Sequence, residues 1–210
     1  MVLDRRTLLA AAAMAGLPIA GLRSARATVP AGVTAATLPE HSLGDPNAKV
    51  VVQEWFSLTC THCAHFSQIV FPEIKAKLID TGKIRYTFHD YPLDQVALAA
   101  AMIADSLPED RYLPFIEALF ASQDRWAFDR SADPMAMLRQ NALLAGMPGG
   151  AADAALHDDA LRRAIIERQD QATRQYNITG TPCFVFNQTV QANVPDYASF
   201  ARYAAEAGAA

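Results

Sequence analysis

Two cysteines three positions apart, Cys60 and Cys63, lie where the apolar pattern of the chain changes from that of a strand to that of a helix. Residues 49–56 are rich in β-branched and aromatic side chains and predict a buried strand. Residues 83–89 predict a second strand. Between them, apolar residues recur at helical spacing, at Phe66, Ile69, Val70, Ile74 and Leu78. The sequence therefore predicts a β–α–β unit of the α/β class whose helix opens at the cysteine pair.

The rest of the chain is predicted to add a helical block and a second, shorter set of strands. Residues 93–157 carry apolar positions at helical spacing. Within this block Asp133-Pro134 marks a helix start, because an aspartate cap precedes a proline at the first helical position. The remaining expected elements, in chain order, are a helix over 159–176, strands over 183–186 and 189–192, and a helix from Asp196.

Composition excludes several classes of protein. The 210 residues are 51% hydrophobic and 19% charged, which is typical of a globular domain with its own core. The formal net charge is −4, and no run of Lys or Arg is longer than a pair, so a nucleic-acid partner is not expected. Three cysteines are too few for a disulfide scaffold, so any sulfur chemistry should be local to the pair.

The first 27 residues have the features of a signal peptide. Arg5-Arg6 precedes an apolar stretch over residues 8–22, and Ala25-Arg26-Ala27 gives the small-x-small pattern of a cleavage site. The apolar stretch is shorter than a membrane-spanning helix requires. The paired arginines leave both general and twin-arginine export open. We expect cleavage after Ala27, a flexible lead-in over residues 28–37, and an exported protein.

Helix position gives the two cysteines different chemistry. Cys60 is placed at the helix N-terminus, where unpaired N–H groups and the helix dipole stabilise a thiolate. Cys63, one helical turn further on, can attack a mixed disulfide at Cys60 and release the partner. His62 lies between them and can donate a hydrogen bond or a positive charge to the Cys60 thiolate. The sequence therefore predicts a redox pair with Cys60 as the exposed thiolate and Cys63 as the resolving thiol.

The cysteine pair could also serve haem attachment, zinc binding or a structural disulfide, and the sequence favours none of these over a redox role. Covalent haem attachment requires histidine at position 64, which is Ala64. Zinc could be held by Cys60, Cys63 and His65, but no second Cys or His pair is apparent, so no metal is expected. A purely structural disulfide would close only a very small loop.

Three further residues are singled out by their local context. Glu54 lies within an apolar strand, where it can serve as a proton acceptor for Cys63 or else face solvent at the end of the strand. Pro182 taken alone fits a trans proline at the start of a strand. Cys183, the third cysteine, is interpreted as a small core residue, with a role in mixed disulfides as the alternative.

Several separated motifs together resemble the thioredoxin superfamily, and specifically its exported DsbA-like thiol oxidoreductases. Cys60-Thr61-His62-Cys63 resembles the active-site motif of that family, Glu54 its buried acid, and Thr181-Pro182 its cis-proline loop. Residues 88–93 are similar to the segment that leads into the helical insertion of the family. Thr61 departs from the pattern, because the best-known members have proline there, and this leaves the redox potential open.

The resemblance implies a thioredoxin fold with an inserted all-helical domain. Residues 38–92 and 158–210 would form the thioredoxin-like domain, and residues 93–157 would form the insertion. The Thr181–Pro182 bond would be cis, and the backbone of Thr181 would pair with an extended substrate.

The function implied is that of a periplasmic thiol:disulfide oxidoreductase. It would donate the Cys60–Cys63 disulfide to folding exported proteins through a mixed disulfide at Cys60, and a membrane redox partner would reoxidise it. No cofactor is expected, and the protein is expected to be a monomer. Two alternatives stay open: an exported thiol reductase of the same fold, and a non-catalytic binding or chaperone module.

Overall fold

The computed structural model describes residues 34–192 and 194–209. The predicted signal peptide (residues 1–27) and the first part of the lead-in therefore lie outside the described residues. Within the described ranges, no helix combines the length and the apolar character needed to cross a membrane.

The centre of the molecule is a five-stranded mixed sheet in the order β1-β3-β2-β4-β5. Strands β2 (Val50–Phe56) and β3 (Ile84–Asp90) are parallel neighbours, as the β–α–β prediction requires. Strand β4 (Cys183–Phe186) runs antiparallel to β2, and β5 (Thr189–Gln191) pairs with β4 at one edge. All four strands were predicted to within two residues. Because β2 and β4 are central, their side chains are largely buried and mostly apolar.

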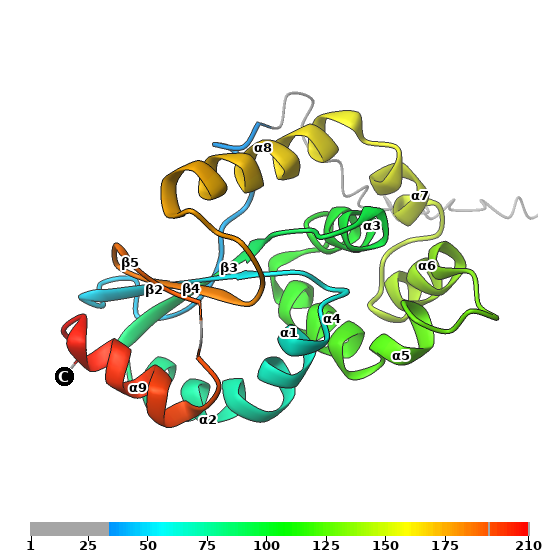
Figure 1. Cartoon of the computed structure of the whole chain (residues 1–210). Helices are drawn as coiled ribbons and strands as arrows, with labels where there is room; N and C mark the ends of the chain where they lie inside the picture. Colours follow the sequence, from blue (N-terminus) through cyan, green and yellow to red (C-terminus); the bar gives the residue numbers. More distant parts are fainter. Residues whose placement is uncertain (1–33, 193, 210) are drawn as a thin grey trace, which may run out of the picture.

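Helices cover both faces of this sheet (Figure 1). One face carries the helix that opens after Cys60, together with α9 (Tyr197–Glu206). The first of these is continuous over residues 61–79, in the segments α1 (Thr61–His65), a π-helical turn (Phe66–Val70), α2 (Phe71–Ile74) and a second π-helical turn (Lys75–Ile79). The first π turn lies just before Pro72, which has no N–H to donate within the helix. Aromatic rings fill the layer below the sheet, among them Phe66, Phe71, Tyr86, Phe184 and Phe200.

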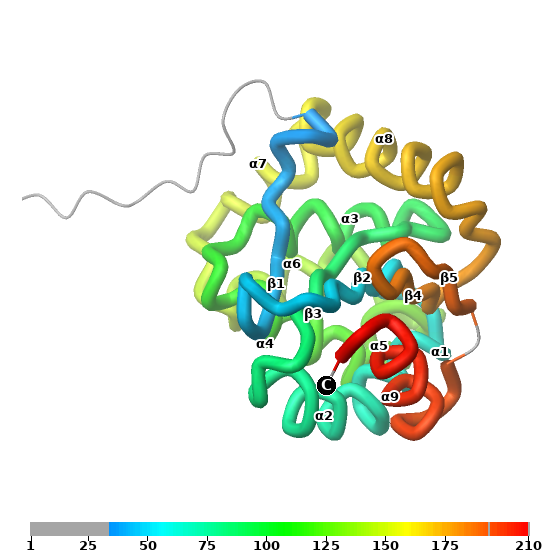
Figure 2. Tube along the Cα trace, turned by 90° about the vertical axis from the view of Figure 1, so that its left-hand side faces the viewer, coloured from blue at the N-terminus to red at the C-terminus, as the bar shows by residue number. Residues whose placement is uncertain are grey.

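The helical block follows β3 and lies beside the sheet (Figure 1). Its helices are α3 (Gln95–Ala104), α4 (Glu109–Ala121), α5 (Gln123–Trp126), α6 (Pro134–Leu144) and α7 (Ala151–Leu156). The long α8 (Asp159–Tyr176) returns across the other face of the sheet and packs on α3 (Figure 2). Asp133 caps α6 as predicted, with its carboxylate accepting the N–H of Met135 at 2.9 Å.

The N-terminal edge differs from the sequence prediction. Strand β1 (His41–Gly44), which was not predicted, pairs antiparallel with β3. Residues 34–37, expected within a flexible lead-in, instead form a turn in which Ala35 is buried. The turn is held by Arg168 of α8, whose guanidinium donates hydrogen bonds to the carbonyls of Ala35, Leu38 and Pro39 at 2.8–3.3 Å. Arg168 and residues 35–39 are about 130 positions apart, so their contact leaves no local pattern in the sequence. The prediction of a flexible segment was therefore wrong at residues 34–37.

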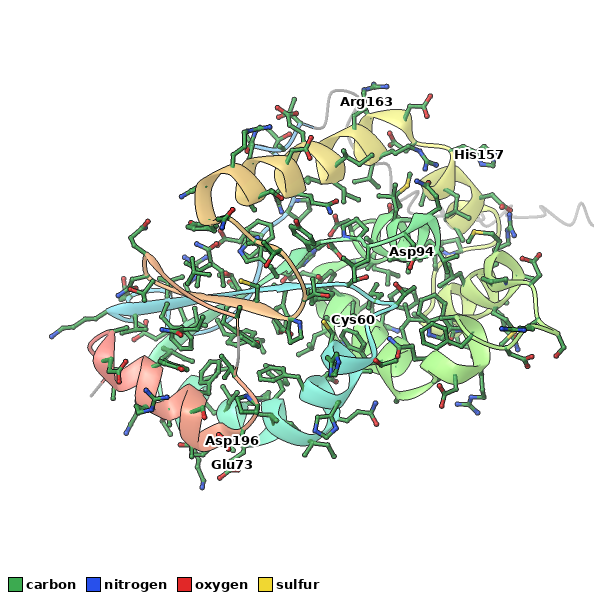
Figure 3. The ribbon with its side chains drawn as sticks, in the orientation of Figure 1. Cys60, Glu73, Asp94, His157, Arg163 and Asp196 are labelled. Atoms are coloured by element: carbon green, nitrogen blue, oxygen red, sulfur yellow. The ribbon has the colours of Figure 1, made fainter. Side chains whose placement is uncertain are left out.

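We predict that Arg168→Ala lowers the free energy of unfolding by about 1–2 kcal/mol, because three partly buried or exposed carbonyls lose a charged donor. Amide hydrogen exchange in the variant should be faster than in the natural protein, and the increase should be largest in residues 34–44. Arg163→Ala is the matched control, because Arg163 lies on the same helix but is exposed (Figure 3). Equal losses of stability in the two variants would contradict the anchoring role of Arg168.

Candidate active site

Cys60 stands at the junction between the sheet and the helix that follows it (Figure 3). It is the N-cap of α1, with an extended backbone (φ −83°, ψ 120°), and its N–H donates to the Ser57 carbonyl at 3.0 Å. The residue is 9% exposed, and its Sγ lies 3.4 Å from the Thr181 carbonyl oxygen. The structure therefore places Cys60 at the helix N-terminus, as the sequence predicts.

The surroundings of Cys60 favour its thiolate. Its pKa is lowered from the ordinary 9.0 to about 5, chiefly because the Cys63 thiol donates a hydrogen bond to its sulfur. Burial opposes this shift, whereas the backbone N–H groups of Cys63 and His62 add to it. The His62 side chain is exposed, and the contribution of this residue to the shift comes from its backbone. The role predicted for its imidazole stays a prediction.

Cys63 has the opposite environment. It is fully buried, and burial raises its pKa well above the ordinary 9.0. The hydrogen bond it donates to Cys60 and the negative charges of Cys60 and Glu54 raise the pKa further. Two sulfurs one helical turn apart thus differ strongly in acidity, which is the arrangement expected of an attacking and a resolving thiol.

Glu54 is a buried acid that faces these sulfurs. It lies in β2 and is 5% exposed, so the alternative that it faces solvent is wrong. Desolvation raises its pKa from 4.5 to about 7 and the Cys60 thiolate contributes to the rise, while a hydrogen bond from Tyr86 acts against it. The Tyr86 hydroxyl donates to Oε2 at 2.7 Å from the neighbouring strand β3. No motif in the sequence points to Tyr86, because only the pairing of β2 with β3 brings the two side chains together.

The loop before β4 closes the other side of the site. The Thr181–Pro182 peptide bond is cis, as the resemblance implies. Both residues border a hollow of about 390 Å³ beside the cysteine pair. Its other walls come from the Cys60 helix and from the segment after β5, and include His62, His65, Phe66, Val70, Val194 and Pro195. An extended chain lying in this hollow would contact Thr181, whose carbonyl oxygen lies 3.4 Å from Sγ of Cys60.

The helical block also contacts the active-site loop. Thr59, which precedes Cys60, donates its hydroxyl to the Asp94 carboxylate at 2.6 Å. The same carboxylate caps α3 by accepting the N–H of Ala97 at 2.8 Å. The start of α3 is thereby fixed beside the cysteine pair (Figure 3).

Cys183 and His65 do not join the redox pair. Cys183 is 1% exposed at the start of β4, pairs with Trp55 across the sheet, and packs in a different apolar cluster from the pair. This position agrees with its interpretation as a core residue. His65 is exposed, and no group of three His, Cys, Asp or Glu side chains within residues 34–192 and 194–209 is arranged to hold a metal ion.

Proteins similar to this chain have names that refer to disulfide chemistry. A putative protein-disulfide oxidoreductase from Rickettsia prowazekii is 31% identical over 146 residues, which are 69% of this chain and 53% of the relative. The chain thus spans about half the length of these curated relatives from Rickettsia. Disulfide bond formation protein D from Bacillus subtilis is 25% identical over 74% of this chain and 71% of its own length.

A solved structure resembles the fold described above. The crystal structure of alpha-DsbA1 from Wolbachia pipientis has a TM-score of 0.73 and 31% identity, and the match covers 81% of this chain and 93% of the other. A family model described as thioredoxin matches residues 36–204, which include both cysteines, Glu54 and the cis-proline loop. With its fold, its paired cysteines and its relatives in agreement, the chain belongs to the thioredoxin family, among members similar to DsbA.

Proposed function

We propose that the protein is a thiol:disulfide oxidoreductase of the DsbA type that oxidises thiols of exported proteins. The observation that carries the proposal is the position of the two cysteines: Cys60 is the N-cap of α1 and Cys63 is buried within that helix, which lowers the pKa of Cys60 and raises that of Cys63. A stabilised thiolate at Cys60 exists only in the reduced protein. It therefore favours reduction of the Cys60–Cys63 disulfide and makes that disulfide an oxidant.

The reaction proceeds through two exchanges. A client thiolate attacks Sγ of Cys60, the Cys60–Cys63 bond breaks, and Cys63 leaves with the electron pair of that bond. Because its pKa is high, the Cys63 sulfur takes a proton, which the Glu54 carboxyl can supply near neutral pH. A second client thiolate then attacks the client sulfur of the mixed disulfide, and Cys60 leaves as its stable thiolate. Two electrons pass from the client dithiol to the cysteine pair.

The cis-proline loop is the proposed client-binding element. The backbone of Thr181 is next to Cys60 and borders the hollow described above. An extended client segment would pair with this backbone, which would hold its cysteine against Sγ of Cys60. Pro182 cannot donate a backbone hydrogen bond, so Thr181 would provide the pairing groups.

The location and partners follow from the same proposal. The predicted signal peptide supports export to the periplasm, where client thiols are oxidised. Each turnover leaves the pair reduced, so an oxidant is needed in that compartment, and we propose a membrane redox partner for this role. The proposed form is a monomer that uses no cofactor.

We predict a reduction potential for Cys60–Cys63 nearer the roughly −120 mV of DsbA than the roughly −270 mV of thioredoxin. The measurement uses the mature chain with Cys183→Ala, equilibrated in glutathione buffers and read by thiol alkylation. The same protein in its disulfide form should oxidise a reduced two-cysteine client, and Cys60→Ser should abolish this activity. A potential near that of thioredoxin would instead identify a reductase, and failure of Cys60 and Cys63 to form a disulfide would favour a binding module.

We predict that Glu54→Gln changes both the pH dependence of stability and the exchange rate. Because the folded-state pKa of Glu54 is raised from 4.5 to about 7, its favourable contribution is complete below pH 4.5 and is lost as the pH rises through 7. The stability of the variant relative to the natural protein should therefore increase by on the order of 3 kcal/mol between pH 4 and pH 8. Its exchange rate at pH 7 should fall at least about tenfold.

The controls for this prediction are an exposed acid and the hydrogen-bond partner of Glu54. Glu167→Gln, at an exposed position of α8, should leave both properties unchanged. Tyr86→Phe removes the hydrogen bond that lowers the Glu54 pKa, so the loss of stability with pH should move to higher pH. An unchanged exchange rate in Glu54→Gln would exclude Glu54 from proton transfer.

A further inference from the structure

A buried amide of the helical block reaches the backbone of the active-site loop. Gln123, the first residue of α5, is 5% exposed. Its Nε2 donates one hydrogen bond to the Leu58 carbonyl at 2.8 Å and another to the Cys60 carbonyl at 3.1 Å. Both protons of the amide nitrogen are thus used on the two carbonyls that flank Thr59.

The position of this amide is fixed from the side of the helical block. Trp126, three residues further along α5, is 1% exposed, and its indole N–H donates to the Leu119 carbonyl of α4 at 2.8 Å. The Gln123 carbonyl in turn accepts the N–H of Ala127 at 2.9 Å. Because the indole of Trp126 and the backbone of Gln123 are both hydrogen-bonded, α5 is fixed in place. The side-chain amide of Gln123 therefore has little freedom to move away from the loop.

The Cys60 carbonyl is the first acceptor of the helix that carries the cysteine pair. It accepts the N–H of Ala64 at 3.1 Å as well as the Gln123 amide. The peptide group of this carbonyl is the first in the opening turn of the helix. The backbone N–H groups of His62 and Cys63, in the same turn, donate to Sγ of Cys60. A donor on the carbonyl both fixes the plane of this peptide group and offsets the negative end of a dipole close to the sulfur.

We propose that Gln123 is a positioning residue for thiol–disulfide exchange, which holds the Leu58–Cys60 loop so that the helix start stays aimed at Sγ of Cys60. The inference rests on the redox function proposed for the pair. It assigns to the helical block a direct part in setting the redox equilibrium. The negative charge on Cys60 exists only in the reduced state. Loss of the two hydrogen bonds from Gln123 therefore destabilises the reduced form more than the disulfide form.

The test is Gln123→Met, which keeps the length of the side chain and removes both donors. The Cys60 pKa, followed by thiolate absorbance, should rise in the variant. Its equilibrium constant with glutathione should move about three- to tenfold toward a less oxidising disulfide, the size expected for one net hydrogen bond.

Gln68→Met is the matched control. Gln68 lies on the Cys60 helix, and its amide also bridges to the helical block, donating to the Phe120 carbonyl at 3.1 Å. Both variants should melt at a lower temperature than the natural protein, but only Gln123→Met should move the Cys60 pKa and the glutathione equilibrium. If both variants leave these two readouts within twofold of the natural protein, Gln123 is merely structural and the proposal is overturned.

A second variant keeps the test decisive if Gln123→Met does not fold. Gln123→Glu keeps the shape of the side chain, and when ionised it places a carboxylate against two carbonyls near the thiolate. The Cys60 pKa should then rise further than in Gln123→Met, and an unshifted pKa would overturn the proposal. The reduction potential of the natural protein, measured in the same buffers, tests the proposed oxidising function separately. Even if the cysteine pair proves to be reducing, the Gln123 and Gln68 variants can still differ in Cys60 pKa and in glutathione equilibrium.

Discussion

The hydrogen bond from the Cys63 thiol to the Cys60 sulfur is the interaction on which the redox site depends. It is the largest cause of the lowered pKa of Cys60, and it adds to the larger effect of burial in raising the pKa of Cys63. The contact exists because Cys60 is the last extended residue before a helix and Cys63 is one turn inside it. Burial then acts unequally, since Cys63 is fully enclosed while Cys60 is 9% exposed and lies against the cis-proline loop.

The sheet supplies the second part of the site. Parallel pairing of β2 with β3 brings Tyr86 to the carboxyl of Glu54, and antiparallel pairing of β2 with β4 sets Cys183 opposite Trp55, in a different apolar cluster from the pair. Glu54 is costly to bury as a carboxylate, and the Tyr86 hydroxyl offsets part of that cost. The resulting pKa of about 7 suits a group that must both give and take a proton near neutral pH.

The parts of the structure with local signals could be predicted from the sequence. The strands flanking the cysteine pair, the helix after Cys60 and the cap at Asp133 all follow from periodicity or from short motifs. The cis bond at Pro182 required the family resemblance, because a proline at the start of a strand is usually trans. Three elements were not individually predicted: strand β1, and the helices α5 and α7, which have four and six residues and are too short to show a helical period.

Side chains that act over long sequence separations were also missed. Tyr86 and Gln123 carry no motif, and their partners lie 32 to 65 residues away in the chain. His41 likewise gave no sequence signal, yet it is buried, stacks on Tyr112, and contacts the carboxylates of Asp105 and Glu109 at 3.2 and 2.8 Å. Such contacts are created by the fold, so they become visible only when the elements are placed in space.

Stabilisation of the Cys60 thiolate can be measured as the difference in unfolding free energy between the reduced and the disulfide forms of the Cys183→Ala protein. The measurement uses denaturant at several pH values from 5 to 8. The folded-state pKa of Cys60 is depressed to about 5, so its contribution to the reduced form is absent below that pH and grows as the pH rises toward the ordinary 9.0. We predict that the reduced form gains stability relative to the disulfide form throughout this range. A difference that stays constant or shrinks as the pH rises would show that the fold does not stabilise the Cys60 thiolate.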